Sequence, residues 1–265
     1  MSETILLVFE GARTEPNIFD NIQKVFFNKS GKSMVYAIFG TEIYKLWKEI
    51  KEDPDLDTLA LLKETAINKA ELTRFSRKEI AEIHLFFDYE GHAHPEMTID
   101  TYNSLIAQML ATFNQENDPG RLWISYPMVE AIKHCKKNIT TCFNRCLAET
   151  ADNTKYKKRI GRIPDFQNAR VLKWPDWRYL LAINIQKAFC LVEGYYKMPS
   201  YIEAQKLFDQ MIIFENQKRK FIIPAASVVV LSSFPFFLSD YFGERQYRKI
   251  LKQKYVKPCR FCCIS

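Results

Sequence analysis

The sequence lacks the long hydrophobic runs that direct secretion or cross membranes. Its first apolar run, Ile5 to Phe9, is only five residues long and follows the acidic Glu3, which is unlike a secretory signal. The longest apolar stretch, Phe221 to Leu238, is interrupted by two prolines and three serines, which argues against a bilayer span. We therefore expect a cytoplasmic protein without a membrane segment, in which the stretch Phe221 to Leu238 forms a buried core helix.

The sequence also lacks a regular cysteine framework. It has seven cysteines, an odd number, and no secretory signal, so free thiols in a reducing compartment are expected. His134 with Cys135, Cys142 and Cys146 matches no established zinc-ligand spacing. The last four residues, Cys262 to Ser265, formally fit a prenylation box, but four residues are weak evidence. We predict neither a zinc centre nor a lipid anchor.

What is present is enough apolar sequence for a large core. The chain has 265 residues, of which 47% are hydrophobic and 14% aromatic, and no internal repeat or low-complexity tract is evident. A polar, basic stretch at 150–164 contains glycine and proline, and we predict a linker there. The predicted domains are a catalytic α/β domain at 1–150, with a helical insertion at about 41–80, and a mostly helical basic region at 151–265.

The first apolar run ends at a carboxylate and a glycine. Ile5 to Phe9 contains β-branched and aromatic residues and is followed by Glu10-Gly11, a pattern typical of a strand buried on both faces. Thr14 offers an N-cap oxygen and Pro16 a preset φ, so a helix should begin there. We predict strand, glycine loop and helix, with Glu10 at the sheet edge where open α/β folds bind ligands.

A second apolar run ends in the same way. Ile83 to Phe87 is followed by Asp88-Tyr89-Glu90-Gly91. Residues i and i+2 of an extended segment point to the same side, so Asp88 and Glu90 can converge on one ligand. If the two strands are parallel neighbours, Glu10 joins them at one edge of the sheet. Three carboxylates in one place repel unless a cation holds them, and all-oxygen ligands suit Mg²⁺ or Mn²⁺.

Each of these acids also has a structural interpretation. Acids at strand ends commonly cap helices or face solvent, although two strands that end alike favour the metal site. Glu15 lies in a first helical turn, where it is either favoured by the helix dipole or a further metal ligand. Glu130 lies one turn inside a helix that Ser125 would cap. It is either a surface residue or a ligand at the sheet edge.

Basic residues are unevenly spread. The net charge is +7, and bases greatly outnumber acids between Lys133 and Lys173, with a second basic segment from Arg245 to Arg260. A solvated basic face and a phosphate-binding surface have the same electrostatic footprint, so both interpretations stay open. The candidate nucleic-acid contacts are Lys133, Lys155, Lys157, Lys158, Arg159 and Arg162.

Three segments of the first half resemble a known family. Glu10 to Phe19 is similar to the EGxxTEPxxF signature that opens the Toprim domain of RloB-like proteins and related OLD-family nucleases. Asp88-Tyr89-Glu90 lies where that fold carries its DxD motif, and Ser125 to Glu130 resembles the later strand-to-helix turn with a glutamate. The resemblance covers roughly residues 1–135 and does not extend beyond Cys135.

The resemblance implies a Toprim-like α/β core and cleavage of phosphodiester bonds with Mg²⁺ or Mn²⁺. It further implies a bacterial anti-phage setting, in which such nucleases often pair with an ABC-type or SMC-like ATPase that holds them in check. This sequence departs from the pattern at Glu90, which replaces the usual second aspartate. The substitution keeps the charge but lengthens the reach of the ligand.

Within this scheme, Asp88 and Glu90 hold one metal ion, and Glu10 orients the nucleophilic water or bridges to a second ion. Glu15 and Glu130 complete a two-metal site, and Lys158 neutralises charge in the transition state. We therefore expect a metal-dependent nuclease acting on DNA or on RNA such as tRNA, and we allow for a homodimer. The alternatives are a non-catalytic nucleic-acid-binding or regulatory subunit, and a small-molecule phosphotransfer enzyme.

Overall fold

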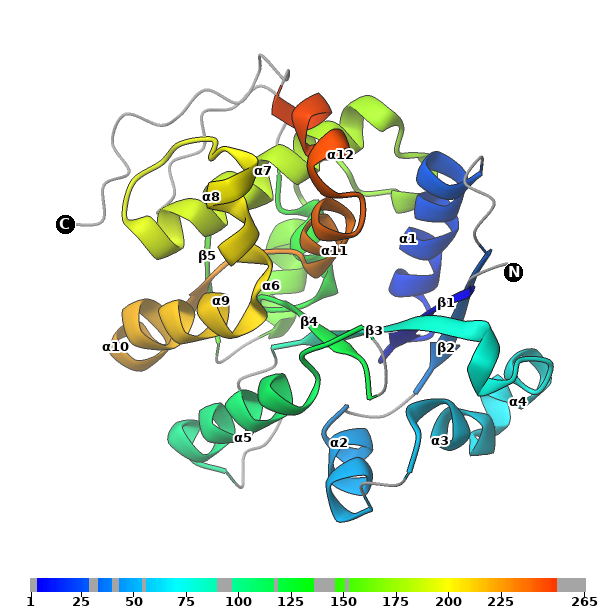
Figure 1. Cartoon of the computed structure of the whole chain (residues 1–265). Coiled ribbons are helices and arrows are strands. Elements are labelled where there is room, and N and C mark those ends of the chain that lie inside the picture. Colours follow the sequence, from blue (N-terminus) through cyan, green and yellow to red (C-terminus); the bar gives the residue numbers. More distant parts are fainter. Residues whose placement is uncertain are drawn as a thin grey trace. The chain divides into compact units, whose positions relative to one another are not determined.

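The computed structural model describes most of the chain (Figure 1). The described ranges are 4–28, 33–39, 43–53, 56–89, 97–116, 119–135, 146–150 and 153–251. The chain divides into two compact units. The first is Met1–Phe87 with Leu105–Trp123, and the second is Asp88–Ser104 with Ile124–Ser265. The predicted boundary near residue 150 falls inside the second unit, and the division into two domains at that point stays a prediction.

Four parallel strands form the central sheet. They are β1 (Thr4–Phe9), β2 (Ser33–Ile38), β3 (Ile80–Asp88) and β4 (Arg121–Ser125), and their order across the sheet is β2-β1-β3-β4. Parallel neighbours need crossover connections, and helices between the strands supply them. The predicted α/β class with a mainly parallel sheet is confirmed.

β1 is a central strand, and all six of its residues are buried. Its last residue, Phe9, pairs in register with Ile38 on one side and with Phe86 on the other. The Phe9 ring also packs against Phe19 and Tyr36, with centroids 6.3 Å and 5.9 Å away. Burial on both faces explains why this strand is a continuous apolar run rather than an alternating one.

α1 (Thr14–Ile22) covers the face of the sheet that carries Phe9 (Figure 1). It buries Ile18, Phe19 and Ile22, as their helical spacing predicted. The helix begins at Thr14 as expected, but its N-cap residue is Arg13 and no side chain caps it. The prediction that the Thr14 oxygen is the cap was therefore wrong. α1 continues into a π-helical turn, Gln23–Phe27.

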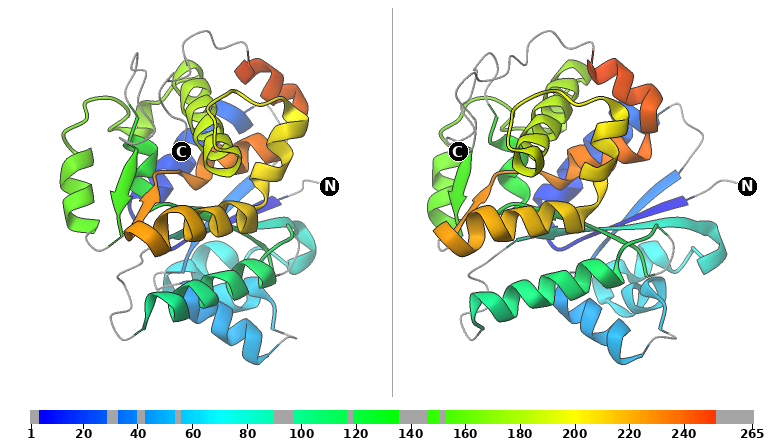
Figure 2. Two further views of the ribbon diagram at one scale, coloured as in Figure 1. Left: turned by 90° about the vertical axis from the view of Figure 1, so that its left-hand side faces the viewer. Right: turned by 60° about the vertical axis from the view of Figure 1, so that its left-hand side comes forward.

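Three helices lie on the other side of the sheet from α1 (Figures 1 and 2). They are α2 (Ile43–Glu52), α3 (Thr58–Glu64) and α4 (Ala66–Leu72), followed by a 3-10 turn at Arg77–Glu79. α5 (Ile99–Thr112) follows β3. Within the first unit, the Trp47 indole N–H donates to the Thr112 hydroxyl at 3.0 Å, which joins α2 to the end of α5.

A buried asparagine closes the edge of the sheet at β2. The Asn68 side chain on α4 accepts from the Ile38 backbone N–H at 2.8 Å and donates to the Ile38 carbonyl at 2.7 Å. A further strand would make these two bonds with Ile38. Because the Asn68 carboxamide makes them instead, the backbone groups of Ile38 are not available to pair with another chain.

α7 (Trp174–Glu193) is the central helix of the second unit. It packs against α9 (Gln210–Gln217), α11 (Ser233–Tyr241) and α12 (Gly243–Leu251). It is buried along nearly its whole length, which fits its apolar residues on every side. Even so, neither α7 nor any other helix in the described ranges is both long and apolar enough to cross a bilayer.

The second unit also contains a small antiparallel pair, β5 (Leu147–Glu149) and β6 (Ser227–Val229). Here a second carboxamide closes a strand edge: Gln217 donates to the Val229 carbonyl at 2.8 Å and accepts from the Val229 N–H at 2.9 Å. The remaining elements are α6 (Asn153–Ile160), a 3-10 turn at Ala169–Val171, α8 (Tyr201–Gln205), a 3-10 turn at Lys206–Phe208, a π-helical turn at Lys218–Ile222 and α10 (Ile223–Ala225).

Two predictions for the second half of the chain were wrong. The apolar stretch Phe221 to Leu238 is not one helix, because the chain leaves α10 at Ala226 in a left-handed conformation (φ 43°), forms β6 and begins α11 only at Ser233. The predicted linker at 150–164 contains a regular helix, α6. Its buried Tyr156 and Ile160 are four residues apart and form one short apolar stripe.

Candidate active site

The two carboxylate-ended strands are parallel neighbours, as predicted. β1 and β3 pair with Phe9 beside Phe86, so both strands end at the same edge of the sheet. Glu10 directly follows β1, and Asp88 is the last residue of β3. Both are half-buried. Glu90, the third predicted ligand, lies outside the described residues.

Glu15 folds back over the loop that follows β1. Its carboxylate is buried and accepts from the Gly11 N–H at 3.1 Å. A Cβ on Gly11 would lie 2.8 Å from both carboxylate oxygens. A side chain at position 11 would therefore have to displace the Glu15 carboxylate, and this glutamate sits in the first turn of α1, where the helix dipole favours it.

Tyr89 anchors the end of β3 within the second unit. Its backbone N–H donates to the Ser125 carbonyl at 2.9 Å, and its hydroxyl donates to the Asn103 side-chain oxygen at 2.8 Å. The side chain is fully buried against the rings of Tyr102 and Tyr126. Burial raises the pKa of the Tyr89 hydroxyl. Asp88 is thus attached to a rigid support rather than to a loose loop.

The turn after β4 differs from the prediction. Ser125 is the last residue of β4, and its hydroxyl shares a hydrogen bond of 2.8 Å with Ser233 at the start of α11. It therefore does not cap a helix that follows β4, and its oxygen instead accepts from the Ser233 backbone N–H at 3.2 Å. A cis peptide bond joins Tyr126 to Pro127, and only a short 3-10 turn, Val129–Lys133, follows.

Glu130 lies in this 3-10 turn. It is half-buried, and its Oε2 atom is enclosed without a hydrogen-bond donor among the described residues. α6 packs against the turn, and the ring of Tyr156 on α6 contacts His134 with centroids 5.7 Å apart. Burial, and to a smaller extent the nearby Glu130 charge, raises the pKa of the Tyr156 hydroxyl. An enclosed carboxylate oxygen without a donor is an unfavourable arrangement that a bound cation would relieve.

Most of the predicted nucleic-acid contacts lie on α6. Lys155, Lys157, Lys158 and Arg159 on the helix, and Arg162 just after it, are all exposed, whereas Lys133 is half-buried at the end of the 3-10 turn. Arg159 differs from the other four. Its guanidinium donates to the Leu147 carbonyl at 2.7 Å and lies over the Tyr156 ring at 5.5 Å.

The structure gives no sign of a zinc centre at the cysteines it describes. Cys135, Cys146 and Cys190 are buried free thiols, and burial raises the pKa of the Cys135 thiol to about 11. A neutral thiol is a poor metal ligand. Cys142 lies outside the described residues.

Taken by unit, the predicted site residues separate into two sets. Glu10 and Glu15 belong to the first unit, and Asp88, Glu130 and the basic residues belong to the second. Within the described ranges, no group of three or more histidine, cysteine, aspartate or glutamate side chains is gathered so as to hold a metal ion.

Comparison of the chain with family models, with curated proteins and with solved structures gave no match.

Several positioning contacts were missed at the sequence level. The Gly11–Glu15 contact joins residues four apart and could have been inferred from the spacing of the glycine and the helix start. The Ser125–Ser233 bond joins residues 108 positions apart, and nothing local in the sequence indicates it.

Proposed function

We propose that this protein is a metal-dependent nuclease with a Toprim-like core, which hydrolyses phosphodiester bonds in DNA or RNA with Mg²⁺ or Mn²⁺. The motif resemblance of the first half supports the proposal, as does the parallel pairing of the two strands that end in Glu10 and Asp88.

The observation that carries the metal part of this proposal is the Glu130 carboxylate. One of its oxygens is enclosed without a donor among the described residues. The ligands that the sequence predicts are all carboxylates, and anionic oxygen donors fit a hard divalent cation. When bound, such an ion supplies electrophilic activation of the phosphate and stabilisation of the leaving oxygen.

The chain's own groups then have separate roles. Asp88 and Glu90 would hold the cation, with Glu130 and Glu15 as further ligands. Glu10 would orient the attacking water and accept its proton. Lys158, exposed on the helix that packs against the Glu130 turn, would offset the negative charge that builds up on the phosphate.

Two further expectations rest on the resemblance alone: a role as the toxic effector of an anti-phage system, and restraint by an ABC-type or SMC-like ATPase. A cytoplasmic location and a homodimeric state are also expected. These stay part of the proposal.

Metal binding and cleavage test the proposal together. Titration calorimetry with Mn²⁺, and cleavage of supercoiled plasmid and bulk tRNA, would compare the wild type with Glu10→Gln, Asp88→Asn and Glu130→Gln. Exposed acids provide the matched controls Glu49→Gln and Glu149→Gln. We expect site variants to lose cleavage by about a hundredfold or more, with both controls unaffected.

Two results would count against this function. Metal binding without cleavage of any substrate would favour a regulatory subunit. Metal-dependent turnover of small phosphate esters, with plasmid and tRNA left intact, would favour the phosphotransfer enzyme.

A further inference from the structure

The positive charge of the chain is concentrated in two short segments, 153–173 and 245–260, of which the first lies wholly within the described ranges. Residues 153–173 contain seven lysines and arginines and a single acid, Asp165, in a chain whose net charge is +7. The remaining 244 residues are therefore close to neutral. We call the seven cations of this segment the polybasic surface, and they are Lys155, Lys157, Lys158, Arg159, Arg162, Arg170 and Lys173.

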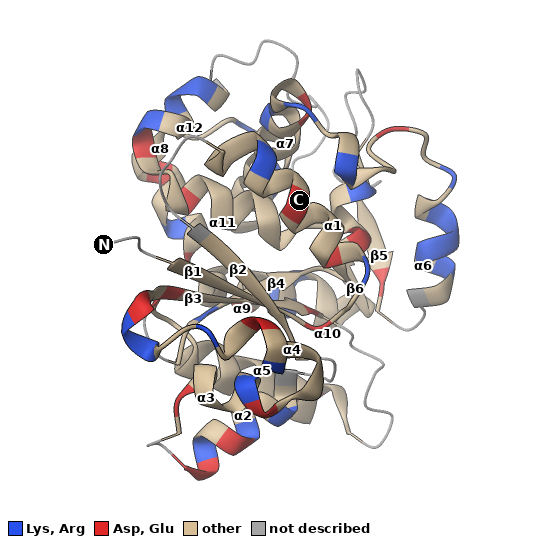
Figure 3. Ribbon diagram, turned by 90° about the vertical axis from the view of Figure 1, so that its right-hand side faces the viewer, with Lys and Arg blue, Asp and Glu red and all other residues tan. Residues whose placement is uncertain are grey.

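All seven cations of the polybasic surface are exposed, and α6 contributes the densest part (Figure 3). Lys157, Lys158 and Arg162 form no ion pair with any residue that the structure describes, in contrast to other cations of the second unit, such as Lys197, Lys206 and Arg248. Like charges placed together without partners repel one another and lower stability, so their retention favours a polyanionic ligand.

The surface is held in a fixed shape. α6 is anchored by its buried Tyr156 and Ile160. The loop after it is tied back by Gln167, whose side-chain amide donates to the carbonyls of Ile160 and Ile163 at 3.0 Å and 2.6 Å. Asn168 caps the next 3-10 turn. Arg162 and Arg170 are thereby carried on an ordered extension of α6 rather than on a loose loop.

The composition of the surface indicates which polyanion it fits. The two aromatic residues of the segment, Tyr156 and Phe166, are buried, so they offer no platform on which bases could stack. One large apolar side chain, Val171, is exposed there, which is too little for insertion into a membrane. Closely spaced cations without stacking groups match the sugar-phosphate backbone, which such residues contact without reading sequence.

We propose that the polybasic surface binds the phosphate backbone of a polynucleotide without sequence preference, and that it includes Arg170 and Lys173 beside the cations of α6. Its role as a substrate-binding surface rests on the proposed nuclease function, whereas binding itself does not. The packing of α6 on the Glu130 turn, with Tyr156 against His134, places the bound backbone on the same support as the proposed metal ligand.

Binding without metal separates this inference from the nuclease activity. Fluorescence anisotropy in EDTA would use the full chain with labelled 20-mer duplexes and single strands of several sequences, from 50 to 300 mM NaCl. The test variant is Lys157→Gln/Lys158→Gln/Arg162→Gln. The matched control, Lys197→Gln/Lys206→Gln/Arg248→Gln, removes the same charge from paired cations of the same unit.

For the test variant, we expect affinity at 100 mM NaCl to fall at least about tenfold and the slope of log K against log salt to decrease by about 2–3. The control should stay within about twofold of the wild type, and all sequences should bind alike. Equal losses in the two variants would overturn the proposal, as would strong sequence preference. Tighter binding to anionic phosphatidylserine vesicles than to nucleic acid would also overturn it. A protein that binds in this way but never cleaves would refute the nuclease and leave the inference standing.

Discussion

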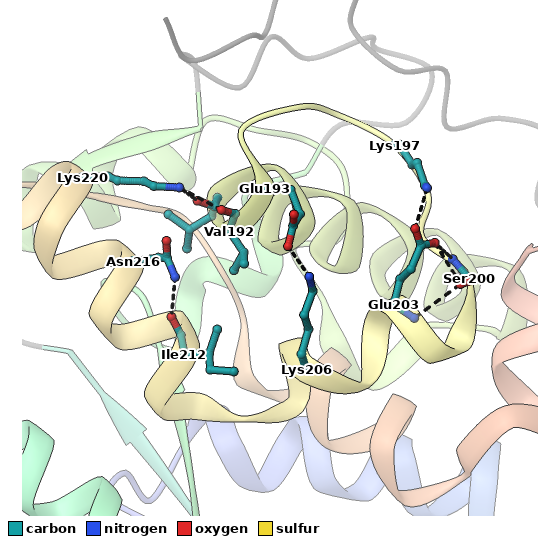
Figure 4. A network of polar contacts seen from close by, with 10 residues as sticks. Val192, Glu193, Lys197, Ser200, Glu203, Lys206, Ile212, Asn216 and Lys220 are labelled. Atoms are coloured by element: carbon teal, nitrogen blue, oxygen red, sulfur yellow. Dashed lines mark hydrogen bonds and ion pairs between the residues drawn. The ribbon is translucent and has the colours of Figure 1, made fainter.

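Two groups of cations on the second unit differ in whether the described residues supply them with partners. Around the C-terminal end of α7, a paired network joins Glu193 with Lys206 and Glu203 with Lys197, while Lys220 donates to the carbonyls of Leu191 and Val192 (Figure 4). On the polybasic surface, Lys157, Lys158 and Arg162 have no anionic partner among the described residues. The difference indicates that the first group serves the fold and the second is available to a ligand.

Lys220 shows what a structural cation does. The last carbonyls of a helix have no partner within the helix, and α7 ends at Gly194, whose φ of 85° closes the turn. Lys220 supplies donors to two of these carbonyls and places a positive charge at the negative end of the helix dipole. Partial burial lowers the pKa of this lysine. Lys157 and Lys158 have no comparable contact with any residue that the structure describes.

The largest expected effect in this comparison comes from Lys220→Met. The change leaves the Leu191 and Val192 carbonyls without their donor, so the free energy of unfolding should fall by about 1–3 kcal/mol. Lys157→Met should change it by less than about 0.5 kcal/mol. Urea unfolding of the two variants beside the wild type measures both values. Equal losses would mean that the two groups of cations do not differ in the way described.

The acids extend the same comparison. Glu203 has partners, whereas one oxygen of Glu130 is enclosed without a donor among the described residues. Without metal, Glu130→Gln should leave the free energy of unfolding unchanged or raise it by up to about 1 kcal/mol, because it replaces this enclosed carboxylate with a neutral side chain.

The metal response of Glu130→Gln is the second half of that prediction. Millimolar Mg²⁺ should raise the melting temperature of the wild type and have a smaller effect on this variant. Thermal melts with and without Mg²⁺ measure this shift in melting temperature, and Glu149→Gln serves as the control. A clear loss of stability in Glu130→Gln, with equal Mg²⁺ shifts in both proteins, would show that this carboxylate is structural.

The pH dependence of stability tests the role of Glu203, the acid of the paired network. Hydrogen bonds from Lys197 and from the Ser200 backbone and hydroxyl lower the pKa of Glu203 to about 2. A group whose folded pKa is depressed stabilises the fold above its unfolded pKa of 4.5, and this contribution is lost as the pH falls toward 2. Between pH 5 and pH 2, the melting temperature of Glu203→Gln should therefore fall less steeply than that of the wild type. Parallel curves would contradict this assignment.

A small effect is expected for Lys206→Gln. Its pair with Glu193 is partly exposed to solvent, with 43% of the Lys206 side chain and 30% of the Glu193 side chain accessible, so the change should lower the free energy of unfolding by less than about 1 kcal/mol. The difference should shrink in 1 M NaCl, where exposed pairs are screened. A larger loss that persists in high salt would place this pair among the buried contacts instead.

The sequence predicted those elements that bury one face, or all faces, over several consecutive turns or residues. β1 and α1 follow from the apolar run before Glu10 and from the helical spacing after Thr14. The stretch from Phe221 to Leu238 was wrongly predicted as one helix because its apolar residues fit a helix and a strand equally well. Only tertiary contacts, such as the antiparallel pairing of Val228 and Val229 with β5, decide between the two.

For the candidate site, local sequence patterns located the acids but not the tertiary hydrogen bonds that hold the neighbouring residues in place. The spacing of Asp88 and Glu90 is visible in the sequence, whereas the bond from the Tyr89 hydroxyl to Asn103 requires the fold. α6 was missed because a run of lysines hides an apolar stripe of only two residues, Tyr156 and Ile160. Its charges were recognised, but not the rigid support beneath them.

The proposed nuclease function assigns roles to Glu130 and to Lys157 and Lys158 of α6, for which the described residues supply no ion-pair partner. Steady-state cleavage of labelled tRNA and duplex DNA in Mg²⁺ tests it most directly when wild type, Glu130→Gln and Lys157→Gln/Lys158→Gln/Arg162→Gln are measured side by side. We predict that Glu130→Gln lowers kcat with little change in substrate affinity, and that the triple variant raises KM and also lowers kcat because it removes Lys158. Unchanged kinetics in both variants, or no cleavage by the wild type with any divalent metal, would contradict it.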